Sequence, residues 1–354
     1  MTVFFLFYYF SWIIFVSGFI YISDVLSNKN KILSRFSIFC AFLVFSLDAY
    51  FKGERGRDSV AYRDHYNLIL NNGGWFPDQG PYDFEPGYNY FIFFLGKFGF
   101  SYDVLAFLIN GLSFFFIFFI SRAFNISKYN LLFLFVLSGF LFFSYNGVRQ
   151  WLALVLVYLS IGVWFSGKKR LKAIVLSGFG FLLHKSSVLF IGFSYSLRYL
   201  SRLKSDDFIL VFFSIVPVVA LIFYVGREFV SQSLGYDNYL NAIELFNYDG
   251  VGYGWLLQVL INIVFLVILF SRKKQLGILE LLALVWVVLY LVAPLDQTVM
   301  RLARYFEFAQ VLVFASVNVN AFLSNFIVSF LIYSLMVVKF VIGVISNSNG
   351  AILG

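Results

Sequence analysis

Charged residues are scarce in this sequence. Only 12% of its 354 residues are Asp, Glu, Lys or Arg, while 61% are hydrophobic and 22% are aromatic. A soluble globular domain of this length needs a far more charged surface, so the composition excludes that class of protein. Apolar runs close to the roughly 20 residues that cross a bilayer recur along the whole chain. We therefore expect an all-α polytopic membrane protein.

Cysteine and histidine are nearly absent as well. Cys40 is the only cysteine, so no intramolecular disulfide can form. His65 and His184 are the only histidines, and no His, Cys and Asp cluster has the spacing of a metal site. Asp58 with Glu85 is chemically able to hold a cation, but nothing else supports a metal. Since nucleotide-binding glycine motifs are also missing, we expect neither a metal nor another cofactor.

The net charge of +8 comes largely from basic residues in short loops. By the positive-inside rule, such loops lie on the cytoplasmic side of the membrane. The charge therefore reports topology, and we do not expect nucleic acid as a partner. The residues concerned are Lys29, Lys31, Arg35, Arg122, Lys128, Lys168, Lys169, Arg170, Lys172, Arg198, Arg202, Lys204, Arg272, Lys273 and Lys274.

The apolar runs predict about 12 to 13 transmembrane or re-entrant helices. Residues 86–98 are too short for a comfortable crossing, so we expect them to be re-entrant or interfacial. One long helix over 171–200 would move later basic loops outside, so we prefer two short spans that meet near His184. The candidate spans are 2–22, 36–51, 103–121, 129–144, 147–166, 171–184, 187–200, 207–226, 253–271, 276–293, 302–320 and 325–345.

The polar segments fall on one side of this topology. No basic region precedes the first apolar run, which predicts a retained first helix with its N-terminus outside. Residues 52–85 and 227–252 then form two large periplasmic loops. Without an internal repeat or a separate soluble segment, residues 1–354 are expected to form a single integral membrane domain.

Arg149 lies inside a hydrophobic segment, in the sequence SYNGVRQWLA. Burying a charge at membrane depth costs roughly 2.5–3.5 kcal/mol on insertion scales, so such a residue is a candidate for function. Ser144 or Asn146 can cap the helix that begins here, which would leave free N–H groups beside the guanidinium. This arrangement describes an anion site. The alternative is an arginine that reaches out to the lipid headgroups.

The sequence RLARYFEF adds two further arginines near the outer side. Arg301 and Arg304 are three residues apart, and so share one helix face. Arginine offers a planar fork that grips phosphate oxygens with two hydrogen bonds. Together with Arg149, they suggest a ligand with several negative charges, such as a diphosphate. The alternative reading pairs Arg304 with Glu307 in a structural ion pair.

His184 lies in FLLHKSSVLF, where the two short spans meet. A lone histidine in an apolar helix is more often structural, but a neutral imidazole on this side can take a proton from a sugar hydroxyl. Carboxylates and tyrosines in GERGRDSVAYRDHY and DFEPGYNY are suited to sugars through hydrogen bonds and ring stacking. The alternative for these segments is an ordinary solvated loop.

The ordered motifs GRDSVAY, EPGY, NGVRQWLA, KKR, FLLHKSS and RLARYF resemble those of EpsG-type, Wzy-class polysaccharide polymerases, from about residue 50 to 310. The resemblance implies a metal-independent bacterial glycosyltransferase of the inner membrane, GT-C-like in fold. Such an enzyme joins oligosaccharide repeat units carried on undecaprenyl diphosphate at the periplasmic face, to make O-antigen or exopolysaccharide. Expected partners are these lipid-linked oligosaccharides as donor and acceptor, membrane lipids, and a chain-length regulator protein.

The resemblance also implies roles for individual residues. Arg149, Arg301 and Arg304 would hold the leaving diphosphate, and His184 would be the candidate base. Other polar residues near the same side would position the acceptor or its sugars. This expected substrate-binding set is Arg57, Asp58, Glu85, Tyr88, Asn146, Gln150, Ser187 and Tyr305.

Three rival functions share some of these features. A flippase for the same lipid-linked sugars would need cations along both leaflets, whereas here they gather on one side. An O-antigen ligase uses the same donor and differs mainly in the order of its motifs. A multipass acyltransferase also uses a histidine base, but clustered arginines are less natural there.

The expected orientation can be tested by labelling. A cysteine introduced within residues 60–80 should react with a membrane-impermeant maleimide applied from the periplasmic side. Protection of that cysteine, with reaction only after the membrane is permeabilised, would overturn the topology.

Overall fold

The computed structural model describes residues 2–51, 59–71, 84–166, 170–200, 253–271, 277–292, 297–317 and 322–348. All of these are helical or connect helices, and no strand occurs among them. The chain divides into two compact units, Met1–His184 with Met336–Gly354, and Lys185–Leu335. The architecture confirms an all-α protein.

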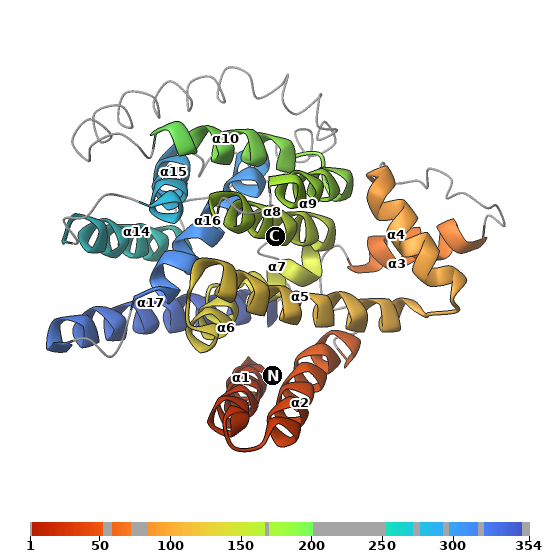
Figure 1. Cartoon of the computed structure of the whole chain (residues 1–354), viewed down its shortest axis with the longest axis horizontal. Coiled ribbons are helices and arrows are strands. Elements are labelled where there is room, and N and C mark those ends of the chain that lie inside the picture. The colour runs from red at the N-terminus through yellow and green to blue at the C-terminus, as the bar shows by residue number, and fades with distance from the viewer. Residues whose placement is uncertain are drawn as a thin grey trace. The chain divides into compact units, whose positions relative to one another are not determined.

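The first unit, called unit 1 below, contains most of the described helices (Figure 1). They are α1 (Thr2–Ser27), α2 (Lys31–Phe51), α3 (Ser59–Asn71), α4 (Pro86–Lys97), α5 (Tyr102–Phe124), α6 (Lys128–Leu137), α7 (Phe140–Asn146), α8 (Val148–Phe165) and α9 (Arg170–Leu183). The second, unit 2, contains α10 (Ser187–Leu200), α14 (Tyr253–Ser271), α15 (Ile278–Val292) and α16 (Gln297–Ala315). The last helix, α17 (Phe322–Ser348), runs from unit 2 into unit 1.

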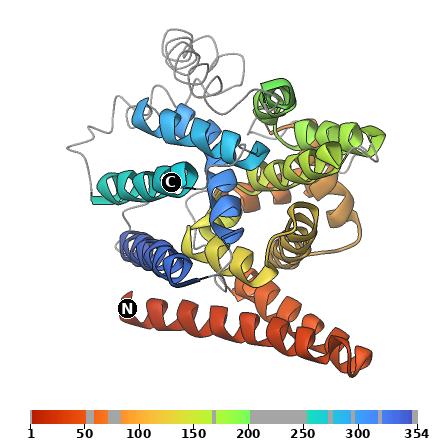
Figure 2. The same cartoon turned by 60° about the vertical axis from the view of Figure 1, so that its left-hand side comes forward.

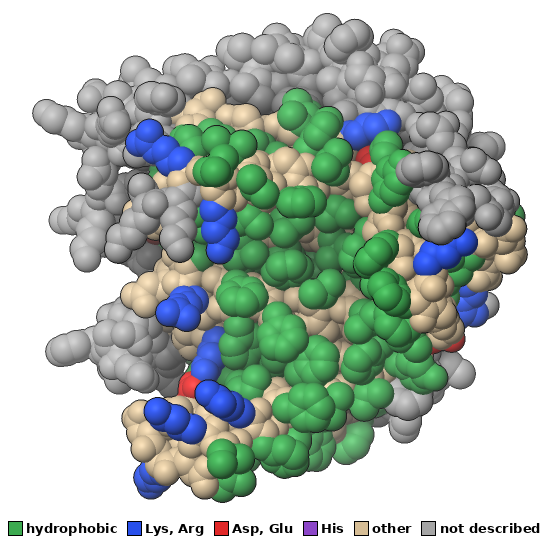
Figure 3. Space-filling view, turned by 45° about the vertical axis from the view of Figure 1, so that its right-hand side comes forward, with side chains coloured by type: hydrophobic (Ala, Val, Ile, Leu, Met, Phe, Trp, Pro, Cys, Tyr) green, Lys and Arg blue, Asp and Glu red, His purple; other side chains and the backbone are tan. Residues whose placement is uncertain are grey.

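Four helices in the described part are long and apolar enough to cross a membrane. They are Phe7–Ser27, Lys31–Tyr50, Tyr102–Phe124 and Val148–Phe165. Large apolar side chains such as Phe36, Phe119 and Ile174 remain exposed on helices of unit 1. Figure 3 shows one face on which hydrophobic side chains form a broad surface, with Lys and Arg toward its margins. A surface of this kind suits contact with lipid tails.

Two details of the helix pattern differ from the sequence-based expectation. Residues 129–144 were expected to form one span, but α6 and α7 are separated at Ser138 and Gly139. Gly139 has a φ of 87°, a left-handed conformation that glycine adopts at little cost. The segment 52–85, expected to form a large periplasmic loop, contains the helix α3, which was not predicted. The buried residues Tyr62, Tyr66 and Ile69 share one face of this helix.

Other expectations agree with the structure. The segment 171–200 is broken near His184, because α9 ends at Leu183 and α10 begins at Ser187. The short apolar segment predicted at 86–98 is α4, a helix of 12 residues, or about 18 Å by helical rise. That length is below the roughly 30 Å of a bilayer core. The predicted span 207–226 and the predicted loop 227–252 lie outside the described residues.

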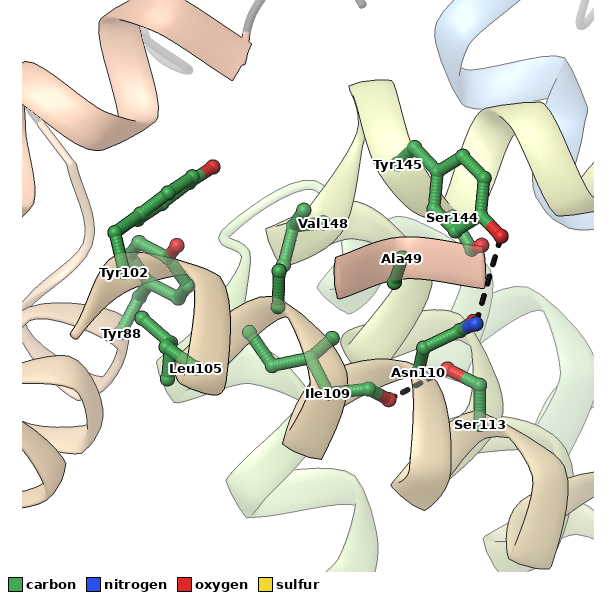
Figure 4. Close-up of a pocket in the computed structure, with 11 residues that line it drawn as sticks. Ala49, Tyr88, Tyr102, Leu105, Ile109, Asn110, Ser113, Ser144, Tyr145 and Val148 are labelled. Carbon is green, nitrogen blue, oxygen red and sulfur yellow. Dashed lines mark hydrogen bonds between the residues drawn. The ribbon is translucent and has the colours of Figure 1, made fainter. Parts of the chain in front are cut away.

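A buried polar cluster links helices α1, α2, α5 and α7. Tyr8 and Tyr145 each donate a hydrogen bond to the carboxylate of Asp48, which is buried in α2. Asn110 on α5 donates from Nδ2 to the carbonyl oxygen of Phe45 at 2.7 Å. It also donates to the hydroxyl of Tyr145 at 3.4 Å (Figure 4). Polar groups inside an apolar bundle need such partners, so the cluster fixes how these helices rotate against one another.

The ends of several helices share one core. Tyr62 and Tyr66 of α3, Tyr88 of α4, Leu105 of α5 and Val148 of α8 all belong to one cluster of buried side chains. Figures 1 and 2 show α3 and α4 beside the first turns of α5. The first turn of α5 lies at the opposite end of that helix from Arg122, the basic residue in its last turn. By the expected topology, this core is at the outer end of the bundle.

Helices α4 and α9 approach closely at Gly87. A Cβ atom at this position would lie 2.4 Å from the carbonyl oxygen of Leu182. Backbone atoms cannot rotate away as side-chain atoms can, so only glycine permits this contact. The approach brings the start of α4 to the end of α9.

We therefore expect Gly87→Ala to destabilise the protein by roughly 1–3 kcal/mol, the usual cost of overpacking. Gly178→Ala on α9 is the matched control, because a Cβ there meets nothing within 4 Å. It should raise stability by about 0.5–1 kcal/mol through its better helix propensity. Thermal unfolding of the purified proteins measures both, and an unchanged melting temperature for Gly87→Ala would contradict the proposed contact.

Candidate active site

One carboxylate joins the two strongest candidates from the sequence. Glu85 accepts a hydrogen bond from Nη1 of Arg149 through its Oε2 atom, and its Oε1 atom lies 2.6 Å from Nδ1 of His184. All three side chains are largely buried in unit 1, with 7% of the Glu85 side chain and 16% of the Arg149 side chain exposed. A cation, an anion and an imidazole therefore form one continuous cluster.

Each member of this cluster lies at the end of a different helix. Glu85 is the N-cap residue of α4, with an extended backbone at φ −62° and ψ 141°. Pro86 follows at the first helical position, where its fixed φ suits a helix start and where it restricts the preceding residue to extended conformations. Arg149 lies in the first turn of α8, and His184 directly follows the last residue of α9. The cluster therefore requires three helix ends to meet.

Two neighbours keep Glu85 ionised. Burial by itself raises the pKa of this carboxyl, but the hydrogen bond from His184 and the charges of His184 and Arg149 outweigh it and lower the pKa to about 2. Because the folded-state pKa lies below the ordinary value of 4.5, these contacts stabilise the fold above that ordinary pKa. Their contribution is lost only as the pH falls toward about 2. Glu85 is thus an anion throughout the physiological range.

The ionised state of Glu85 determines the tautomer of His184. A carboxylate can only accept hydrogen bonds, so Nδ1 of His184 must carry the proton that it donates to Oε1. In the neutral imidazole, the lone pair is then on Nε2. The negative charge of Glu85 and the carboxyl end of α9 both stabilise the protonated ring. This is the arrangement that a histidine needs in order to act as a general base through Nε2.

Arg149 is oriented by aromatic residues. Its guanidinium carbon lies 3.8 Å from the centre of the Phe84 ring and 5.9 Å from that of Tyr62, and its Nε donates to the Tyr62 hydroxyl at 3.5 Å. Stacking on aromatic rings and a hydrogen bond at each of two nitrogens fix the orientation of the guanidinium group. Its Nη2 group makes no hydrogen bond to any residue that the structure describes. That group is therefore held in a fixed direction, and its role in binding an anion stays a prediction.

A small cavity lies beside this cluster. Tyr88, one turn after Glu85, and Val148, next to Arg149, both line it (Figure 4). Its volume is about 20 Å³, which is enough room for one water molecule. Asn110 Oδ1 is buried there and meets no donor within the described residues. A water in the cavity would satisfy this oxygen.

The expected residues of unit 2 form a separate group. Arg304 donates to Glu307 at 2.5 Å, which is the ion pair that the sequence offered as the alternative reading. Tyr305 and Ser187 are both buried, and the Tyr305 ring lies 5.3 Å from that of Phe190. The joint action of Arg304 and Arg149 on one ligand stays a prediction.

The remaining candidates are placed only in part. Gln150 is buried in the first turn of α8. Asn146 ends α7 and Arg301 lies in α16, but their side chains fall outside the described residues, as do Arg57 and Asp58 entirely. Their assigned roles therefore stay predictions.

The expected cap of α8 is wrong for Ser144. The N-cap residue is Gly147, which has no side chain to form a cap, and Ser144 donates to the carbonyl of Leu141 instead. The N-cap lies two residues before Arg149, so Gly147 takes the position that Ser144 or Asn146 was expected to fill.

Sequence reasoning missed the central role of Glu85 as a bridge. It assigned this residue to sugar positioning and did not pair it with Arg149 or His184. Phe84 and Tyr62, which orient Arg149, were also missed as a pair. The available signal was a carboxylate directly before a proline, which marks a helix start at Glu85 and Pro86.

Comparison with known proteins identifies a family. The family model described as the EpsG family matches residues 35–353, nearly the whole chain. No curated protein and no solved structure matches this chain. The match includes Glu85, Arg149 and His184.

We expect Glu85→Gln to lower the pKa of His184 by roughly one unit or more, because the ring loses the adjacent negative charge. The titration can be followed by ¹⁵N NMR of labelled histidine. Asp103→Asn is the matched control, since Asp103 pairs with Arg63 in a partly exposed ion pair 3.1 Å long. A His184 titration that is the same in both variants and in the wild type would show that Glu85 does not act on the ring.

Proposed function

This chain belongs to the EpsG family, a family of Wzy-like polymerases, and we propose that it polymerises a surface polysaccharide from undecaprenyl-diphosphate-linked repeat units. The reaction takes place at the periplasmic face of the bacterial inner membrane. The donor is the growing chain on its lipid diphosphate, and the acceptor is the next lipid-linked unit. The observation that carries the proposal is the bridge from Arg149 through Glu85 to His184.

The proposed step is a glycosyl transfer. A hydroxyl of the acceptor sugar attacks the anomeric carbon of the donor, and the bond from that carbon to the diphosphate oxygen breaks. The hydroxyl proton moves to Nε2 of His184, while the electron pair of the broken bond leaves with the diphosphate. Glu85 keeps its negative charge and stabilises the imidazolium that forms.

Arg149 acts on the leaving group. Negative charge develops on the diphosphate as its bond to the sugar breaks, and a preoriented guanidinium in a largely buried site stabilises that charge effectively. Nη2 is the group that supports this role, because Nη1 and Nε already bind Glu85 and Tyr62. Arg301 and Arg304 are proposed to bind the same diphosphate from α16.

Acceptor binding is assigned to groups near the same helix ends. Tyr88 lines the cavity beside Glu85, and Tyr62 faces Arg149. Arg57 and Asp58, which directly precede α3, are proposed to contact the acceptor sugar, with Gln150 and Asn146 beside Arg149. Ser187 and Tyr305 are assigned to the same substrate from unit 2. The resemblance to the polymerase motifs carries these assignments.

Purified protein with a synthetic undecaprenyl-diphosphate-linked repeat unit tests the reaction. The wild type should give a ladder of longer oligosaccharides and release undecaprenyl diphosphate. Arg149→Ala should lower the rate by about 10²–10³-fold, and His184→Ala by about 10²–10⁴-fold, as expected for lost charge stabilisation and lost base catalysis. Arg304→Ala should also reduce extension.

Arg63→Ala is the matched control, because its partly exposed ion pair with Asp103 is of a kind that contributes little, typically about 0–1 kcal/mol. It should extend chains at nearly the wild-type rate. Normal polymer from both Arg149→Ala and His184→Ala would refute the site. Transfer only to lipid A would indicate a ligase, and transport without transfer would indicate a flippase.

A further inference from the structure

The second histidine of the chain lies behind the candidate site. His65 is fully buried on α3, and its Nε2 lies 2.8 Å from Oδ1 of Asn89 on α4. Asn89 is buried as well, and its Nδ2 donates to the carbonyl oxygen of Phe84 at 3.3 Å. Since Nδ2 must be the amide donor, Oδ1 is the acceptor, and Nε2 of His65 carries the proton. Donation therefore runs in one direction, from His65 to Asn89 to the backbone of Phe84.

Phe84 connects this chain of hydrogen bonds to the site in two ways. Its ring lies over the guanidinium of Arg149, with 3.8 Å between the ring centre and the guanidinium carbon. Its backbone leads directly into Glu85, which binds both Arg149 and His184. The His65 ring also contacts the Phe84 ring, at 4.2 Å between centres. Any movement of Phe84 would therefore displace both the ring that stacks on Arg149 and the Glu85 carboxylate that binds it.

We propose that His65 and Asn89 are positioning residues, which hold Phe84 and Glu85 in the conformation that binds Arg149 and His184 together. The expected effect of these residues on catalysis rests on the proposed function, whereas their effect on the position of Glu85 does not. Neither residue belongs to the set that the sequence assigned to the site.

The neutral form of His65 suits this role. Burial lowers its pKa, while the hydrogen bond to Asn89 acts in the opposite direction and the charge of Arg149 lowers the pKa further. A neutral ring can donate from Nε2 without adding a second positive charge behind Arg149. His65 thus acts as a fixed donor, whereas His184 is the residue whose proton changes.

Two substitutions at one position separate positioning from simple packing. In His65→Gln, the side-chain amide can place an N–H near the position of Nε2 and so can still donate to Asn89. In His65→Leu, that donor is lost while the apolar volume is largely kept. Because the chain has only two histidines, both variants leave His184 as the single histidine, and ¹⁵N NMR then reports its titration alone.

We expect a lower His184 pKa in His65→Leu than in His65→Gln, by roughly half a unit or more, because a displaced Glu85 stabilises the imidazolium less. We also expect kcat to fall about 10–100-fold in His65→Leu with KM changed little, and to recover in large part in His65→Gln. Tyr66→Phe in the His65→Gln background is the control. It removes the neighbouring hydrogen bond to Phe100, 2.5 Å long, and should move neither quantity.

Coinciding titrations and equal kcat values in the two His65 variants would overturn the proposal. So would a His184 shift of the same size in the Tyr66→Phe control. A His184 shift without polymerase activity in the wild type would support the positioning role and reject the proposed function. The NMR titration and the polymerase assay therefore test the two ideas separately.

Discussion

The candidate site depends on one pair of contacts, which the ionised carboxylate of Glu85 makes with Arg149 and His184. A guanidinium in the first turn of an apolar helix is costly unless an anion compensates it, and a buried anion in turn needs donors for both of its oxygens. Glu85 meets both requirements, because Arg149 binds one oxygen and His184 binds the other. The cost of each buried group is thus offset by the next. The starts of α4 and α8 and the end of α9 must meet for this to occur.

Unit 2 offers an instructive contrast. Arg304 and Glu307 have the same chemistry as Arg149 and Glu85, but they are three residues apart on one helix. A pair of this kind forms wherever the helix forms, so it ties no other element into place. The cluster in unit 1 joins segments distant in sequence and depends on tertiary packing. The close approach at Gly87 and the shared aromatic core supply that packing.

The helices were more predictable than the site. Apolar runs located α5, α8, α9 and α14 to within a few residues, because a segment in lipid needs apolar side chains and must satisfy its backbone hydrogen bonds within a helix. The break at Gly139 was missed because an apolar sequence continues through it. Arg149 and His184 were found as polar residues in an apolar field. The role of Glu85 in joining them was not predicted. Glu85 lies 64 positions from Arg149 and 99 from His184, and contacts between such distant residues leave no periodic pattern in the sequence.

The ring of Phe84 beneath Arg149 has a consequence for molecular recognition. One face of the guanidinium is covered at 3.8 Å, and two of its three nitrogens are engaged by Glu85 and Tyr62. The remaining amino group therefore points in a single direction. Such a cation does not attract negative charge evenly from all sides, as a lysine ammonium would. In the proposed site, an anionic oxygen would approach along the edge left open, so the angle of approach would contribute to selectivity together with the charge.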